Sequence, residues 1–122
     1  GDDRGALALG RWRDAIMQED NYEMLLVINC YRPLTQNVPD TLEVMHEIEY
    51  AAGMRFTAIV NNSNLAGETT AETVLNSLPY AEEMSKATGL PVKMTTVFEH
   101  LYPSLEGKID NLFPLRLQDK II

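Results

Sequence analysis

Three asparagines, Asn61, Asn62 and Asn64, stand close together directly after an apolar stretch in the middle of the chain. An asparagine amide carries both a hydrogen-bond donor and an acceptor, so it can read the edge of a planar heterocycle such as a nucleobase. Asparagine also tolerates left-handed backbone and stabilises turns, which makes a purely structural role an equal alternative. The cluster therefore predicts either a base-binding loop or a tight turn.

A second polar segment begins at Asn29 and also follows an apolar stretch. Arg32 precedes Pro33 in this segment, and a residue before proline is restricted to extended backbone. A guanidinium held there can clamp a phosphate, or it can pair with Glu68 or Asp40 to fix the loop, and we favour the pairing. For Asn29 we expect a hydrogen-bonded tie between neighbouring loops, with ligand contact as the alternative.

The other reactive side chains are isolated in the sequence. His46 and His100 lack the spacing of metal ligands, so no metal site is predicted. We expect His46 on a helix surface, whereas His100 follows an apolar stretch and is the better site candidate. Cys30 is the single cysteine and has no spaced histidine partner. We expect an inert, partly buried thiol in a reducing, cytoplasmic setting.

Apolar patterning indicates alternating strands and helices, in one domain without internal repeats. Strands are predicted over 24–30, 56–60 and 92–97, and helices over 5–19, 40–52, 70–78 and 80–87. Asp40 is the expected cap of the second helix, Thr69 or Thr70 caps the third, and Pro79 breaks it. Residues 101–122 form a tail whose structure the pattern does not define.

This alternation predicts an α/β fold, in which right-handed crossovers build a parallel sheet flanked by helices. Ligands of such sheets bind beyond the carboxyl ends of the strands. The segments that begin at Asn29 and Asn61 both follow predicted strands. We therefore expect both segments at one edge of the sheet, and any chemistry of the protein there.

The composition narrows the possible functions. The chain has 122 residues, of which 45% are hydrophobic, and a formal net charge of −8. That length suits one domain or a large part of one, and the apolar fraction excludes a chain that is disordered by composition. The acidic balance argues against nucleic acid as a partner. The longest apolar run, Met24 to Ile28, is far too short to cross a membrane.

Four segments resemble one known family. The chain opens with G-D-D-R-G-A-L-A-L-G-R, and it continues with V-I-N-C-Y-R-P-L-T at 27–35, I-V-N-N-S-N-L at 59–65 followed by E-T-T at 68–70, and G-L-P-V at 89–92. In this order the segments are similar to the sequence that follows the Walker B aspartate in ParA/MinD/CobQ-type P-loop ATPases of the SIMIBI class. The resemblance runs from residue 1 to about residue 100.

The resemblance implies that residues 1–122 are the carboxyl-terminal portion of a P-loop NTPase-like domain, a Rossmann-like three-layer sandwich. No G-x-x-x-x-G-K-[ST] phosphate loop occurs in the sequence, so the part of the domain that grips the phosphates is absent from it. The intact parent would bind ATP and Mg²⁺ and would act as an ATPase, whereas this chain alone is expected neither to bind ATP tightly nor to hydrolyse it. Asn61 matches the family's adenine-contacting asparagine, with Asn62 beside it. Asp2 and Asp3 match the loop near the γ-phosphate and Mg²⁺, as weak catalytic candidates.

Two other functions remain open. A parallel sheet that lacks its first strands has an unpaired edge, which predicts an interaction module that forms a homodimer or an edge-paired oligomer. A flavodoxin-like domain is the third alternative, with Trp12 stacked on a flavin, although the tyrosines that would assist it are scattered along the chain.

Overall fold

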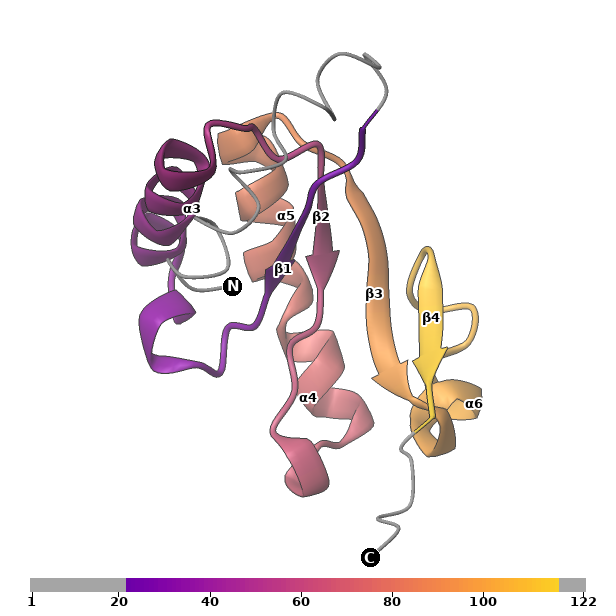
Figure 1. Ribbon diagram of the computed structural model, residues 1–122. Helices are drawn as coiled ribbons and strands as arrows, with labels where there is room; N and C mark the ends of the chain where they lie inside the picture. Colours follow the sequence, from indigo (N-terminus) through magenta and orange to yellow (C-terminus); the bar gives the residue numbers. More distant parts are fainter. Residues whose placement is uncertain (1–21, 117–122) are drawn as a thin grey trace, which may run out of the picture.

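Four parallel strands follow one another across the sheet in the order in which they occur in the chain. The structure, a computed structural model, describes residues 22–116. The strands are β1 (Leu25–Ile28), β2 (Ala58–Asn61), β3 (Val92–Phe98) and β4 (Leu112–Leu115), paired in the order β1-β2-β3-β4. All four run in the same direction, so their carboxyl ends share one edge, the lower edge in Figure 1. The predicted α/β class with a parallel sheet is confirmed.

Helices and short 3₁₀ turns connect the strands. The helices are α3 (Val38–Ala52), α4 (Ala71–Asn76), α5 (Leu78–Thr88) and α6 (Tyr102–Leu105). The 3₁₀ turns are η1 (Pro33–Thr35), η2 (Ala66–Glu68) and η3 (Glu99–Leu101). The helix expected over 5–19 lies outside the described residues. None of the helices within residues 22–116 is long and apolar enough to cross a membrane.

The start of α3 differs from the prediction. Asn37, not Asp40, caps the helix, because the Asn37 side chain accepts a hydrogen bond from the backbone N–H of Asp40 at 2.9 Å. Pro39 therefore lies in the first helical turn, where its missing N–H costs nothing, rather than in the preceding loop. The helix ends as expected at Gly53, whose φ of 66° suits a residue without a Cβ atom.

The predicted break between two helices is present, but it lies at Ser77 and not at Pro79. Thr70 caps α4 and exchanges hydrogen bonds with Thr73 in a capping box. The pattern then restarts at Leu78, and Pro79 occupies the first turn of α5, where proline is tolerated. Gly89 ends α5 with a φ of 75°.

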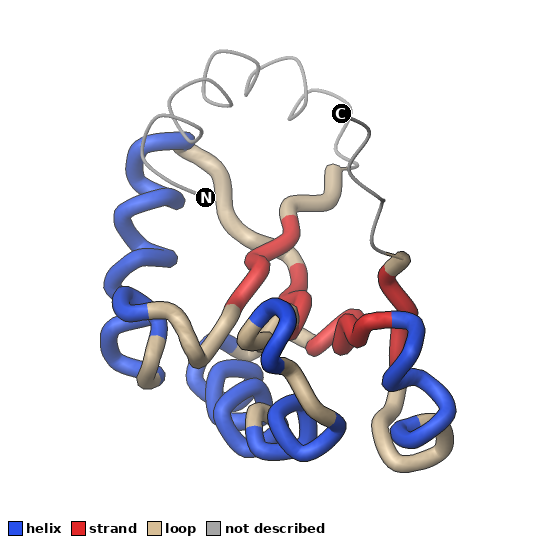
Figure 2. The backbone as a smooth tube through the Cα atoms, turned by 90° about the horizontal axis from the view of Figure 1, so that it is seen from below, coloured by secondary structure: helices blue, strands red, loops and turns tan. Residues whose placement is uncertain are grey.

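All the described helices pack on one face of the sheet, which we call the covered face. Because side chains alternate along a strand, the strand register assigns Leu26, Ile28, Ile59, Asn61, Thr95 and Val97 to this face. Leu26, Ile28 and Ile59 pack with α3 and α5 in one core, and Val97 packs with α4 and α6 in a second. Figure 2 shows α4 and α5 on one side of the strands, with α3 beside the β1 end of the sheet. The described residues thus form two layers of the three that were expected.

The carboxyl-terminal segment contains structure that the sequence did not indicate. Leu105 of α6 is fully buried in the second core, and β4 pairs with β3 from Leu112 to Leu115. Glycine and proline interrupt this segment so often that no periodicity is visible, and tertiary packing decides its structure. The tail left undefined from residue 101 is therefore part of the sheet and its core as far as residue 116.

Candidate functional site

The polar segments expected to meet at one edge of the sheet do so. The loop that begins at Asn29 follows β1, the loop that begins at Asn62 follows β2, and η3 follows β3. All three leave the carboxyl ends of parallel strands (Figure 1). This is the edge at which sheets of this class hold their ligands.

Asn29 ties the first two loops together, as predicted. Its Nδ2 donates to the carbonyl oxygen of Asn64 at 3.3 Å, and its Oδ1 accepts from the backbone N–H groups of Asn64 at 3.3 Å and Tyr31 at 3.0 Å. Thr35 adds a bond from its hydroxyl to the Asn29 carbonyl at 2.6 Å. The Asn29 amide therefore has a structural role, which is the predicted tie between the two loops.

Asn61 lies in the interior and not at the rim. The residue is 0% exposed, its Nδ2 donates to Ser77 Oγ at 3.0 Å, and its Oδ1 accepts from Ser63 Oγ at 2.7 Å. The Ser63 hydroxyl also accepts from the backbone N–H of Cys30 at 3.1 Å, and Ser77 donates to the carbonyl of Val74 at 2.6 Å. In this arrangement Asn61 joins β1, β2 and the α4–α5 junction, and its fully buried amide is out of reach of a base.

The amide at Asn62 is the one that remains open. Its Oδ1 accepts from Thr96 Oγ1 at 2.5 Å, while its Nδ2 makes no hydrogen bond to any residue in the described part of the chain. Asn64 beside it is used locally, since its Nδ2 donates to the Asn62 carbonyl and its Oδ1 accepts from the N–H of Ala66. Alternation along β2 places Asn62 on the side of the sheet opposite the helices.

An aromatic pair lies next to this amide. The rings of Phe98 and His100 stack with centroids 6.2 Å apart and planes within 6° of parallel. Phe98 also lines, with Asn62 and Thr96, a small hollow of about 10 Å³. That volume holds about one water molecule, so a base would lie over this surface rather than inside it. Sequence reasoning singled out His100 but missed Phe98, whose position at the end of a strand was the available signal.

Arg32 does not make the ion pairs that were favoured. It is exposed, and within residues 22–116 it pairs with neither Glu68 nor Asp40. Its backbone is extended before Pro33, as predicted, with φ −96° and ψ 143°. The guanidinium at the carboxyl end of β1 is thus free of described acidic partners.

Tyr31 ties the loop after β1 to α4. Its hydroxyl donates to the carbonyl of Thr73 in α4 at 2.6 Å. Burial, with a smaller contribution from Cys30, raises the pKa of Tyr31 above its ordinary value. Cys30 is a free, partly buried thiol, as predicted.

The remaining candidates contribute little here. His46 is exposed on α3 with Glu49 at 3.6 Å, which confirms the helix-surface prediction. No three acidic, histidine or cysteine side chains group as metal ligands among the described residues. Asp2 and Asp3 lie outside the described residues.

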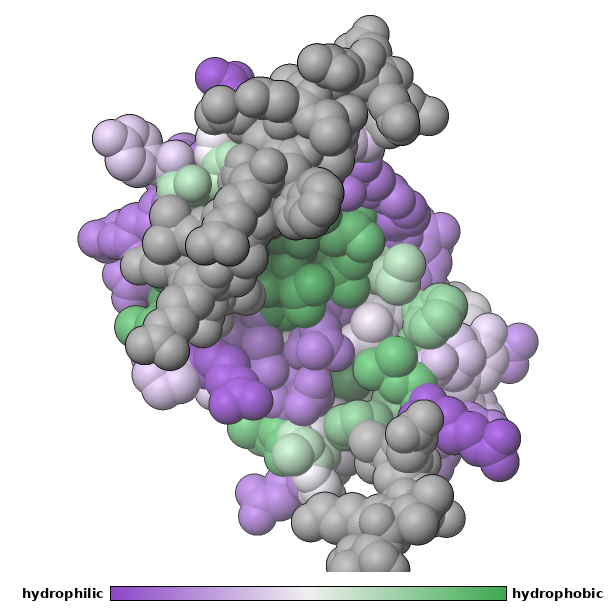
Figure 3. All heavy atoms as spheres, in the orientation of Figure 1, coloured by the Kyte–Doolittle hydropathy of each residue, from purple (hydrophilic) through white to green (hydrophobic). Residues whose placement is uncertain are grey.

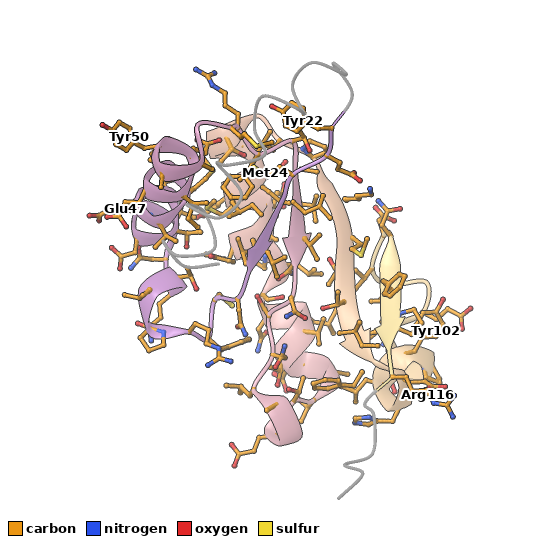
Figure 4. The ribbon with its side chains drawn as sticks, in the orientation of Figure 1. Tyr22, Met24, Glu47, Tyr50, Tyr102 and Arg116 are labelled. Carbon is orange, nitrogen blue, oxygen red and sulfur yellow. The ribbon has the colours of Figure 1, made fainter. Side chains whose placement is uncertain are left out.

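A wider hollow lies at the opposite edge of the sheet. It has a volume of about 720 Å³ and is lined by residues at the amino ends of the strands, among them Tyr22, Thr57 and Asn111. Figure 4 shows Tyr22 and Met24 at this edge, while Arg116 lies at the carboxyl end of β4. The charged groups of the hollow, Glu23 and Lys93, are paired with each other. The carboxyl edge, where the Asn62 Nδ2 and the Arg32 guanidinium have no partner in the described part of the chain, is therefore the stronger candidate.

Comparison of the chain with models of known families, with curated proteins and with solved structures found no match. The candidate site consequently rests on its own geometry and on the sequence resemblance described above.

Proposed function

We propose that this chain is the carboxyl-terminal half of an ATP-binding domain of the P-loop type, and that it supplies the surface for the nucleobase. The observation that carries the proposal is the Asn62 amide, whose Nδ2 makes no hydrogen bond within residues 22–116, beside the Phe98 ring at the carboxyl edge of a parallel sheet; Phe98 in turn stacks on His100. A base can accept a hydrogen bond from Asn62 Nδ2 and stack on an aromatic ring, which favours a planar heterocycle over a simple anion. The sequence resemblance supports ATP as the nucleotide.

In this proposal Asn62, and not Asn61, contacts the nucleobase. The buried Asn61 holds the loop after β2 in place through its hydrogen bonds with Ser63 and Ser77. Asn62 follows directly, and its N–H₂ group makes no hydrogen bond to any residue from 22 to 116. The resemblance pointed to this pair, and the burial of Asn61 favours Asn62 as the member that meets a base.

The phosphates and Mg²⁺ need more than the described residues provide. Arg32 lies at the same edge without an acidic partner among residues 22–116, and a guanidinium suits a phosphate. Mg²⁺ prefers carboxylate and water oxygens in octahedral geometry, and no acidic cluster occurs within residues 22–116. The base surface fits the nucleotide, whereas the metal ligands and the phosphate loop must come from elsewhere in the parent. We accordingly propose that the parent is an ATPase and that this chain alone is not.

Titration of the ¹⁵N-labelled chain with AMP, followed by NMR, tests the base surface. We expect binding at about millimolar concentration, which corresponds to about 4 kcal/mol, because one hydrogen bond and one stacking surface are the only contacts proposed. The amides of Asn62 and Phe98 should shift, and the amide of exposed Asn76 should not. The variant Asn62→Ala should weaken AMP binding about tenfold, with Asn76→Ala as the matched control.

Two results would contradict the proposal. Unchanged AMP binding in Asn62→Ala would show that Asn62 does not contact the nucleobase. Micromolar ATP binding by the chain alone would show that it contains its own phosphate-binding residues.

A further inference from the structure

A hollow lies on the covered face, where the two hydrophobic cores meet. It has a volume of about 400 Å³ and is bounded by α5 on one side and by the loop of residues 106–111 on the other, and we call it the α5 hollow. Ala81 and Val92 in its wall pack with the first core, and Ile109 packs with the second. A volume of this size is typical of small-molecule sites.

The short connection between β3 and β4 explains why this space is open. β3 has seven residues and spans about 23 Å, whereas α6 has four residues and is about 6 Å long. α6 lies at the carboxyl end of β3, and the chain then returns to the start of β4 without a further helix (Figure 1). The other half of β3 is therefore flanked by α5 and by a loop, and the space that a longer helix would fill is left between them.

The polar group at the base of the α5 hollow is the hydroxyl of Thr95. Strand register places Thr95 on the covered face between Asn61 of β2 and Leu112 of β4, and the residue is 3% exposed. Its hydroxyl makes no hydrogen bond to any residue from 22 to 116. No side-chain nitrogen or oxygen that is sealed from solvent lacks a partner in the described part of the chain, so the Thr95 oxygen opens into the hollow that the residue lines.

This unused hydroxyl sets Thr95 apart from the other buried threonines of residues 22–116. Thr41 and Thr69 each donate to a backbone carbonyl at 2.7 Å, and the Thr73 hydroxyl accepts from the backbone N–H of Thr70 at 3.0 Å. A buried hydroxyl without a partner costs free energy. A molecule in the hollow that hydrogen-bonds to Thr95 would recover that cost.

The charges around the α5 hollow favour a ligand without net charge. Glu82 pairs with Lys86 along α5 at 3.4 Å, and the exposed Lys108 and Asp110 contribute one charge of each sign. The lining therefore has no excess of either sign. A charged group placed against the neutral Thr95 hydroxyl would lose its hydration without meeting a counter-charge there.

We propose that the α5 hollow is a binding site for an uncharged, mostly apolar small molecule whose polar group hydrogen-bonds to the Thr95 hydroxyl. The apolar part of the molecule contacts Ala81 on α5 and Ile109 on the facing loop. Burial of this apolar surface supplies most of the affinity, and the hydrogen bond to Thr95 fixes the orientation.

The α5 hollow is separate from the base surface. Thr95 and Thr96 are neighbours in β3, so their side chains face opposite sides of the sheet. Thr96 holds Asn62 on the side opposite the helices. Figure 3 views that opposite side, where hydrophobic residues gather over the strands. The inference therefore does not depend on the proposed nucleotide function, and either site can be present without the other.

NMR titration of the ¹⁵N-labelled chain with 2-phenylethanol tests the site, because this uncharged probe has one apolar ring and one hydroxyl. We expect saturable binding at about millimolar concentration, with shifts at the amides of Ala81, Thr95 and Ile109. Toluene, which has the ring without the hydroxyl, should shift the same amides.

The variant Thr95→Val removes the hydroxyl and keeps the branched shape of the side chain. It should weaken 2-phenylethanol binding about fivefold, because one hydrogen bond is lost, and leave toluene binding unchanged. Thr95→Ser keeps the hydroxyl and should bind 2-phenylethanol more tightly than Thr95→Val does. Thr88→Val is the matched control, because the Thr88 hydroxyl donates to the carbonyl of Met84 and lies outside the hollow.

Four results would overturn the proposal. The absence of saturable shifts at Ala81, Thr95 and Ile109 would mean that only water meets the Thr95 hydroxyl. Shifts at Asn62 in their place would assign the probe to the base surface. Equal 2-phenylethanol binding in Thr95→Val would show that the hydroxyl does not contact the ligand. Tighter binding of phenylacetate, weakened by Lys108→Met, would show that the hollow selects an anion instead of an uncharged molecule.

Discussion

The two faces of β1 differ strongly in solvent exposure, although the residues on both faces are apolar. Leu26 and Val27 are neighbours in β1 and similar in hydrophobicity, yet Leu26 is 5% exposed and Val27 is 54% exposed. Leu26 packs into the core with α3 and α5, whereas Val27 lies on the face without a described helix. The apolar run of β1 is typical of a strand that is buried on both faces. The exposed fractions show that, within the described residues, only the face toward α3 and α5 is covered.

Truncation of the covered side should have the largest effect. Leu26→Ala removes a buried side chain from the main core and should lower the free energy of unfolding by about 2–5 kcal/mol. Denaturant titration followed by circular dichroism measures the loss. A cost below about 1 kcal/mol would show that the covered face is not a packed core.

The buried asparagine comes next. Asn61→Ala leaves Ser63 and Ser77 without their shared partner and should cost about 1–3 kcal/mol. Asn76→Ala is the control, because Asn76 is exposed at the end of α4. Equal stability of the two variants would contradict the placement of Asn61 in the interior.

A smaller effect is expected where α5 meets α3. The Tyr80 hydroxyl and Thr41 Oγ1 lie 2.6 Å apart, and Tyr80→Phe should cost about 0.5–1.5 kcal/mol. Burial raises the pKa of Tyr80 above the ordinary 10.0, against a lowering by the bond to Thr41. The folded state then holds this proton more tightly than the unfolded state.

The pH dependence follows from that sign. The contribution of Tyr80 is fully present below pH 10 and is lost as the pH rises through the folded pKa. Unfolding measured from pH 8 upward should show a shallower alkaline decline in Tyr80→Phe than in the parent chain. Tyr50→Phe, at an exposed position, should leave the decline unchanged.

The smallest effect belongs to the uncovered side. Val27→Thr keeps the β-branched shape and should change the free energy of unfolding by no more than about 0.5 kcal/mol. The same denaturant titration measures it beside Leu26→Ala. A loss above 1.5 kcal/mol would mean that Val27 is packed in this chain, and would erase the contrast between the faces.

Much of the fold was predictable because local signals and packing agree. The apolar runs predicted β1, β2 and β3 to within a few residues, and Gly53 and Gly89 marked helix ends that the structure confirms, whereas Pro79 marked a break that the structure has two residues earlier, at Ser77. The α3 cap was wrong because two candidate caps, Asn37 and Asp40, stand three residues apart, and the proline between them fits either a loop or a first turn. For β4, only pairing with β3 defines the strand.

The candidate site was predictable in place but not in detail. Strand ends located the loops, yet neighbouring asparagines alternate between interior and surface, and one residue of register decides which is free. The sequence therefore named Asn61 first, while the geometry leaves Asn62 open. Arg32 was assigned a partner from charge alone, and no contact in the described structure supplies one.

The sequential order of the strands has a consequence for synthesis. Each strand pairs with the one made just before it, so the sheet can grow at one side as the chain leaves the ribosome. Every newly made strand and its helix add to a finished neighbour, and no strand has to be inserted between two others. Cotranslational assembly of this chain can therefore proceed without waiting for its carboxyl terminus.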